Sequence, residues 1–327
     1  MKVIIRTDAS ETIGIGHVMR CLIIADELRK RNCSVSFLMK PLPGNLITEV
    51  KQRGYNVITT FSPADICIID HYDIDINWEK KIRPYVNKII VIDDLANRRH
   101  DCDVLLDQNL TKNDKTRYDD LVPNYCKKLL GIEYFLMREE FAMERKNLRQ
   151  RTGELHRLLV FMGGSDPTNE TLKVLQALQE TSHPFSQIDV VVGKSNPQAE
   201  KIKKICKYEG FAFHIQVDYM AKLMHQADFS FGTGGTAMWE RCLLALPSTS
   251  TIVAKNQLDA TKQAAKLGVT WNLGWHGNIT VATYKQVINE LTVRKQQLKT
   301  MSARAADLTK NVRSIRKIVD IFLEDVT

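Results

Sequence analysis

The chain has 327 residues, a length that predicts two domains at about 150 residues per domain. Hydrophobic residues make up 44% of it and charged residues 26%, as in globular proteins, which excludes a disordered or fibrous chain. The net charge of +8 favours an anionic partner, such as nucleic acid, acidic lipid or a phosphorylated small molecule, and does not choose among them.

Two further features bear on the compartment. No apolar run reaches the ~18 residues that a membrane helix needs, and the first residues fit a strand better than a signal peptide. The seven cysteines form no C-x-x-C pair, which favours free thiols over disulfides or a zinc site. We therefore expect a cytoplasmic protein with no stable membrane insertion.

Short β-rich runs alternate with amphipathic stretches along the whole chain. In the first half, strands are predicted at 2–7, 34–39, 55–59, 66–70, 88–93 and 104–107, with a helix at 17–31. In the second half, strands are predicted at 157–162, 189–192, 211–216, 228–231, 250–253 and 269–271, and helices at 168–181, 199–209, 218–226, 236–246 and 258–267. Continuous apolar strands between helices indicate parallel sheets covered on both faces. The predicted fold class is α/β, with two doubly wound Rossmann-like domains.

A charged stretch with few large apolar residues, 138–156, marks the seam between the domains. We place the N-terminal domain at 1–150 and the C-terminal domain at 151–327. Ligands of open α/β sheets bind outside the carboxyl ends of the strands, and a cleft between two facing domains is the expected site. The polar residues at the predicted strand ends are therefore the candidates.

The first strand-end loop contains Gly14, Gly16 and His17, directly before a helix. Two glycines let backbone N–H groups approach an anion at the helix N-terminus. A dinucleotide fingerprint would need Gly or Ala in place of Met19, and an acidic residue at the end of the second strand, so NAD is disfavoured. The positive end of the helix disfavours an imidazolium, which indicates that His17 is a neutral catalytic base.

The second loop joins a strand to a helix through Gly163 and Gly164, with Ser165 or Asp166 as the helix cap and Pro167 in the first turn. Paired glycines would let a substrate pass close to the backbone. A well-made turn explains the same residues, and the sequence leaves both interpretations open.

The third loop contains Gly234, Gly235 and Thr236, whose N–H groups can hold a diphosphate at a helix N-terminus. Glu240 lies one helical turn beyond Thr236, where a carboxylate can hold two ribose hydroxyls or remain a surface charge. The loop has no Walker lysine pattern, so hydrolysis of a nucleoside triphosphate is disfavoured.

Other strand-end residues give weaker signals. The amides of Asn256 and Gln257 follow the next strand, and their place at a third strand end favours a ligand contact. Asp93 and Asp94 are neighbours on a strand and face opposite ways, so a turn cap is favoured over a metal site. No nucleic-acid motif accompanies the tryptophans. We expect no metal, no cofactor and no nucleic-acid partner.

Together these residues resemble the GT-B superfamily of nucleotide-sugar enzymes, including the MurG-type N-acetylglucosaminyltransferases. The chain is more similar to the UDP-2,4-diacetamido-2,4,6-trideoxy-β-L-altropyranose hydrolases of pseudaminic acid synthesis and to the related spore-coat polysaccharide protein SpsG. The segments that carry the resemblance are 6–10, 14–21, 92–98, 106–110, 162–166 and 256–257. The aspartates of 92–98 and 106–110 separate this family from ordinary GT-B transferases.

The resemblance implies a two-domain GT-B fold with UDP held mainly by the second domain. It also implies that His17 is the catalytic base, that Tyr72 and Asn256 lie near the sugar, and that Glu240 binds the uridine ribose. Substrate and UDP contacts are expected from Asp8, Gly14, Gly16, Gly163, Gly164, Asp166, Asn169, Thr233, Gly234, Gly235, Thr236, Glu240 and Gln257. The chain departs from several relatives at 233–236, a loop that is serine-rich in them.

The implied reaction is hydrolysis of the UDP-linked sugar to UDP and free sugar. A water activated by His17 attacks the anomeric carbon with inversion, and UDP, a stable anion, leaves without a metal or a general acid. Two alternatives stay open: a UDP-sugar glycosyltransferase of the same fold, which needs an acceptor groove, and a non-catalytic nucleotide-sugar-binding protein of spore-coat polysaccharide synthesis. We expect a monomer.

Overall fold

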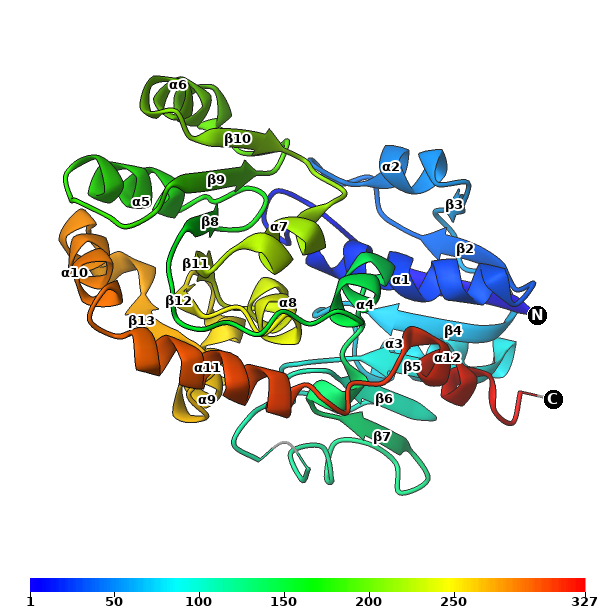
Figure 1. The fold of residues 1–327 in the computed structure, drawn as a ribbon. Coiled ribbons are helices and arrows are strands. Elements are labelled where there is room, and N and C mark those ends of the chain that lie inside the picture. The colour runs from blue at the N-terminus through cyan, green and yellow to red at the C-terminus, as the bar shows by residue number, and fades with distance from the viewer. Residues whose placement is uncertain (114, 327) are drawn as a thin grey trace. The chain divides into compact units, whose positions relative to one another are not determined.

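The computed structural model describes residues 1–113 and 115–326, which form two compact units (Figure 1). Unit 1 comprises Met1–Arg138 and the C-terminal segment from Asn311, and unit 2 comprises Glu139–Lys310. This division differs from the one expected at residues 150 and 151, because the first unit ends earlier and the chain returns to it at its C-terminal end.

Packing explains both differences. Helix α4 (Glu139–Arg145) belongs to unit 2, where a Glu140 carboxylate oxygen accepts the Ala221 N–H at 3.1 Å and Arg145 donates to the Leu243 carbonyl. Helix α12 (Ile315–Leu323) is strongly amphipathic and buries Phe322 and its apolar neighbours in the core of unit 1, against α1 (Gly16–Lys30).

Unit 1 is built on a parallel sheet in the order β3-β2-β1-β4-β5-β6-β7. Its strands are β1 (Lys2–Thr7), β2 (Ser34–Leu38), β3 (Asn56–Ile58), β4 (Ala64–Asp70), β5 (Val86–Ile92), β6 (Val104–Asp107) and β7 (Lys127–Leu130). Its other helices are α2 (Ile47–Gln52), α3 (Ile76–Ile82), η1 (Arg83–Tyr85) and η2 (Ile132–Tyr134). The central strands are apolar and buried on both faces, as in doubly wound sheets.

Unit 2 is built on a second parallel sheet in the order β10-β9-β8-β11-β12-β13. Its strands are β8 (Arg157–Phe161), β9 (Gln187–Val192), β10 (Ala212–Ile215), β11 (Phe229–Thr233), β12 (Ser248–Ile252) and β13 (Trp271–Trp275). Its remaining helices are α5 (Glu170–Gln179), α6 (Ala199–Glu209), α7 (Met220–Gln226), α8 (Thr236–Leu243), η3 (Lys255–Gln257), α9 (Leu258–Lys266), η4 (His276–Asn278), α10 (Val281–Leu291) and α11 (Lys295–Leu308).

Each sheet reverses its strand order once, between β1 and β4 in unit 1 and between β8 and β11 in unit 2. The register pairs Thr7 with Asp70 and Phe161 with Gly232, so the loops that follow these neighbouring strands start side by side. Such reversals are the places where open α/β sheets bind ligands.

The predicted α/β class with two doubly wound parallel sheets is confirmed. Every predicted strand overlaps an observed one, whereas β7 was not predicted, because this edge strand begins with two exposed lysines. Within 1–113 and 115–326, the structure contains no helix long and apolar enough to cross a membrane.

Candidate active site

His17 is the second residue of α1 and is held by a carboxylate at the end of β4. Its Nδ1 lies 2.6 Å from Oδ1 of Asp70, and only 7% of the residue is exposed. An ionised carboxylate only accepts hydrogen bonds, so Nδ1 carries the proton, and in this tautomer the lone pair is on Nε2. Among the described residues, Nε2 has no hydrogen-bond partner. The side chain is therefore arranged as a proton acceptor.

Arg20 clamps Asp70 from the next turn of the same helix. Its Nε donates to Oδ2 at 2.5 Å and its Nη2 to Oδ1 at 2.6 Å, a bidentate pair. Burial alone raises the pKa of Asp70, but the charge of Arg20, together with His17, outweighs it and holds the pKa well below its usual range. Asp70 is therefore a permanent anion whose orientation is fixed.

Asp94 and Tyr72 complete the arrangement around His17. Asp94 accepts from Arg20 Nη1 at 3.3 Å through one oxygen and from the Tyr72 hydroxyl at 2.8 Å through the other. The Tyr72 ring stands edge-to-face against the His17 ring, with centroids 4.5 Å apart. We call His17, Arg20, Asp70, Tyr72 and Asp94 the His17 cluster. The structure thus brings together two of the predicted site residues, His17 and Tyr72, and three residues that were assigned no role in catalysis or binding.

The turn that carries Asp94 is held by its neighbour Asp93, as predicted. Oδ2 of Asp93 accepts the N–H groups of Leu95 and Ala96, and the Tyr118 hydroxyl donates to it at 3.0 Å. These donors occupy Oδ2 of the carboxylate. The two main-chain bonds stabilise a turn in which Ala96 adopts a positive φ of 48°.

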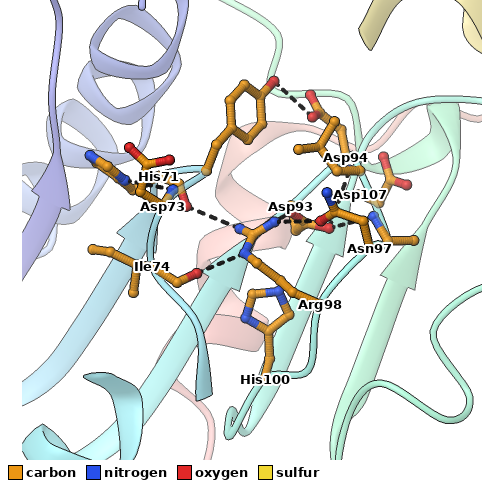
Figure 2. Close-up of polar contacts among 12 residues, drawn as sticks. His71, Asp73, Ile74, Asp93, Asp94, Asn97, Arg98, His100 and Asp107 are labelled. Atoms are coloured by element: carbon orange, nitrogen blue, oxygen red, sulfur yellow. Dashed lines mark hydrogen bonds and ion pairs between the residues drawn. The ribbon is translucent and has the colours of Figure 1, made fainter. Parts of the chain in front are cut away.

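Arg98 joins this turn to the segment that carries Tyr72 (Figure 2). It donates from Nη1 to Asp93 at 2.6 Å, from Nη2 to the His71 carbonyl at 3.0 Å and from Nε to the Ile74 carbonyl at 2.7 Å. One guanidinium therefore fixes the spacing between the two loops whose side chains meet in the His17 cluster.

Asp107, at the end of β6, is a titratable group to which the sequence assigned no role. It is 2% exposed, and burial, with smaller contributions from the charges of Asp94 and Asp93, raises its pKa to about 7 despite the nearby Arg117. Asn109 connects it to the His17 cluster, since its N–H donates to Asp107 at 2.9 Å and its side-chain amide to Asp94 at 3.4 Å.

Asp8 was predicted to contact the substrate, but the structure gives it an internal role. Arg6 donates to both of its oxygens at 2.6 and 2.7 Å, the Lys40 N–H donates at 2.8 Å, and His71 Nε2 lies 3.1 Å away. The residue is 1% exposed. Asp8 therefore links the ends of β1, β2 and β4 and places the segment that carries Tyr72.

The loop before α1 is a tight turn that contains Gly14 and leads into the helix at Gly16. Gly14 has a φ of 80°, and its N–H closes a tight turn onto the Ser10 carbonyl at 2.8 Å. Helix α1 has no side-chain cap and no acidic residue in its first turn. In the described chain, the N–H groups of Gly16, His17 and Val18 have no acceptor. An anion at this helix end stays a prediction.

In unit 2, the loop after β8 is a turn capped by Asp166. Its two oxygens accept the N–H groups of Glu170 and Thr171 at 2.9 and 2.8 Å, so the first donors of α5 are already satisfied. The helix begins at Glu170, after Asn169 in a left-handed conformation, two residues later than the predicted start at residue 168. This carboxylate serves the helix, and ligand contacts of Gly163, Gly164 and Asn169 stay predictions.

The loop after β11 leaves a helix end open. Gly235 has φ 77° and ψ −155°, a conformation restricted to glycine, and α8 follows it without a side-chain cap. The Gly234 N–H donates to the Thr251 carbonyl, so this N–H is already engaged, whereas the sequence predicted that it could hold a diphosphate. The N–H groups of Gly235, Thr236 and Ala237 have no partner within the part of the chain that the structure describes.

Several predicted residues surround this loop. A Cβ on Gly234 would meet Thr261 Oγ1 at 2.5 Å and Gln257 Cβ at 3.1 Å, so the η3–α9 segment packs directly on it. Glu240 lies one turn into α8 and is 6% exposed, Thr233 is buried beneath the loop, and Asn256 is exposed on η3. Among the described residues, no group of three or more His, Cys, Asp or Glu side chains is placed to hold a metal ion.

Comparison with known proteins adds the following. No protein-family model matches the chain. It is 31% identical over 280 residues to the UDP-2,4-diacetamido-2,4,6-trideoxy-β-L-altropyranose hydrolase of Campylobacter jejuni, covering 82% of this chain and 97% of that protein. It is 27% identical over 146 residues to the spore coat polysaccharide biosynthesis protein SpsG of Bacillus subtilis, covering 44% and 43%. MurG of Acinetobacter baumannii shares the fold, with 13% identity and a TM-score of 0.65 over 98% of both chains, which confirms the predicted GT-B fold.

We predict that Asp70→Asn destabilises the protein and changes the tautomer of His17. The variant leaves Arg20 as a buried cation without its main partner, which costs about 3–5 kcal/mol in the free energy of unfolding. An Asn amide can donate an N–H to Nδ1, which a carboxylate cannot, so the proton is no longer held on Nδ1. ¹⁵N NMR of the imidazole should therefore show the loss of the Nδ1–H form. The exposed Asp73→Asn is the matched control. Unchanged stability and tautomer in Asp70→Asn would contradict the assigned geometry.

We also predict that Asp107 makes the protein less stable as the pH rises from about 4 to 7. Its folded pKa of about 7 lies above the unfolded value of 3.8, so the folded state binds the extra proton in this window and loses the advantage as that proton dissociates. The change is on the order of 4 kcal/mol. Urea unfolding at pH 5 and pH 8 should show a smaller pH difference for Asp107→Asn than for the wild type, and equal differences would count against the raised pKa.

Proposed function

Since this chain belongs to the family of the UDP-2,4-diacetamido-2,4,6-trideoxy-β-L-altropyranose hydrolases, we propose that it cleaves this UDP-linked sugar to UDP and the free sugar. The observation that carries the proposal is the pairing of His17 with Asp70, which leaves Nε2 unengaged at the open N-terminus of α1. A hydrolase needs such a base to activate water, whereas a protein that only binds a nucleotide sugar does not.

In the proposed reaction, Nε2 of His17 removes a proton from a water as the water oxygen bonds to the anomeric carbon. The bond between that carbon and the phosphate oxygen breaks, and its electron pair leaves with UDP. Attack from the face opposite UDP inverts the configuration. Asp70 stabilises the imidazolium that forms, and His17 then returns the proton to solvent, so that one water is consumed and one proton released.

We assign UDP to unit 2. The open N–H groups of Gly235 and Thr236 at the start of α8 support this, because helix N-termini attract phosphate oxygens. Glu240 is assigned to the uridine ribose. Gln257, which packs against the loop before α8, is assigned to the UDP-linked substrate. Tyr72 and Asn256 are assigned to the sugar. Leaving-group stabilisation by main-chain N–H groups needs no metal.

We assign the proposed reaction to pseudaminic acid synthesis or to a related surface-polysaccharide pathway. The similarity to SpsG supports the wider assignment to polysaccharide synthesis. All seven cysteines are free thiols, including Cys102 and Cys126, whose sulfurs lie 3.6 Å apart, and this state supports a reducing compartment such as the cytoplasm. A transferase of the same fold remains the competing function, and its need for an acceptor separates the two.

Purified protein should release UDP from the UDP-linked sugar without an acceptor and in the presence of EDTA. His17→Leu removes the base, so its rate should fall by about 10²–10⁴-fold. The exposed His156→Leu is the matched control and should keep the wild-type rate. UDP release that requires an acceptor sugar would assign the chain to the transferases. Full activity in His17→Leu would show that His17 is not the catalytic base.

The stereochemistry gives an independent prediction. Direct attack by water requires that the anomer formed first has the opposite configuration to the substrate, before mutarotation mixes the two forms. A ¹H NMR time course of the anomeric region should show this order. First appearance of the retained anomer would indicate a covalent intermediate and contradict single-step attack.

A further inference from the structure

Arg241, in the second turn of α8, is a fully buried cation without an anionic partner. Its exposed fraction is 0%, and within the described chain no carboxylate lies within ion-pair distance of its guanidinium. Nη2 donates to the Thr233 carbonyl at 2.7 Å, to Ser250 Oγ at 3.0 Å and to the Thr249 carbonyl at 3.4 Å. Nε and Nη1 are buried and have no hydrogen-bond partner among the described residues. Such a charge is destabilising unless something compensates it.

Arg151 shows what a compensated buried arginine looks like in the same unit. It is also buried, and it has no carboxylate partner among the described residues. Its guanidinium donates to the carbonyls of Met224, His225 and Ala227 at the end of α7, and to that of Leu244 at the end of α8. These are the negative ends of two helices, so the protein itself balances this charge.

Arg241 lies instead directly behind the loop at the start of α8. Its Nη2 holds the carbonyl of Thr233, the last residue of β11, and Gly234 and Gly235 follow. A Cβ on Gly232 would collide with Nη1, so the absence of a side chain there lets the guanidinium reach the strand. The cation is thus bound to the residue that precedes this loop, whose main-chain N–H groups from Gly235 onward have no partner among the described residues.

The charge persists at the pH of the reaction. Burial is the main cause that lowers the pKa of Arg241, and it lowers it only to about 10. Cys242 and Glu240 adjoin it in sequence, and their charges act in the opposite direction, raising the pKa of Arg241. The guanidinium is therefore protonated at neutral pH and remains without an ion-pair partner in the described chain.

We propose that Arg241 is the fixed counter-charge for the diphosphate of the ligand, and that it acts through the Thr233–Gly235 loop without touching the ligand. The inference rests on the proposed function, which assigns UDP to unit 2. Charges attract more strongly across buried protein than across water, so a cation behind the loop favours the phosphates over the neutral nucleoside. Arg241 is therefore a positioning residue with an electrostatic role.

The test compares UDP, UMP and uridine by isothermal titration calorimetry. Arg241→Gln removes the charge but keeps N–H donors for the Thr233 carbonyl, and Arg241→Lys keeps the charge. We expect Arg241→Gln to weaken UDP binding by about tenfold or more, UMP binding by less, and uridine binding by less than about twofold. Arg241→Lys should retain most of the UDP affinity, and Arg151→Gln should show no loss that is selective for UDP.

The outcomes separate this inference from the proposed function. If the wild type does not bind UDP, the proposed function fails and the inference fails with it. If the wild type binds UDP but Arg241→Gln binds it normally, or loses UDP and uridine equally, only the counter-charge is overturned. Should Arg241→Gln not fold, Gly232→Ala displaces the guanidinium from the strand and must give the same UDP-selective loss for the inference to stand.

Discussion

The arrangement in unit 1 depends on one shared carboxylate. Asp70 binds the Nδ1–H of His17 with one oxygen and is held by Arg20 through both. The three residues come from two segments about 50 residues apart, which meet because β1 and β4 are neighbours at the reversal of strand order. Without this carboxylate, the ring has no fixed tautomer and Arg20 is buried without its main partner.

The two units use charge in different ways. In the His17 cluster of unit 1, a buried carboxylate and a buried guanidinium group pair with each other and orient one imidazole ring, in the contacts of Asp70 with Arg20 and with His17. In unit 2, main-chain N–H groups at the start of α8 stay open, and Arg241 behind them stays unpaired. The first arrangement suits proton transfer at a fixed position, and the second suits the capture of an anion.

The sequence predicted the fold class and His17 because both have local signals: buried strands between amphipathic helices, and a glycine turn before a helix. It could not predict Arg20 and Asp70 as the partners of His17, because that contact depends on which strands become neighbours. Asp8 and Asp166 show a second reason why the structure was needed. A carboxylate after a strand has the same sequence pattern whether it binds a ligand or caps the backbone, and only the structure shows that internal donors occupy their oxygens.

The central claim is that water attacks the anomeric carbon and that UDP leaves with its own oxygens. Turnover in water enriched in ¹⁸O, followed by mass spectrometry of UDP, tests it most directly, because the anomeric hydroxyl of the free sugar exchanges with solvent and UDP does not. The account predicts that UDP contains no ¹⁸O, since the bond that breaks is between carbon and oxygen. One ¹⁸O atom in the β-phosphate would show attack at phosphorus and would contradict the assigned role of His17.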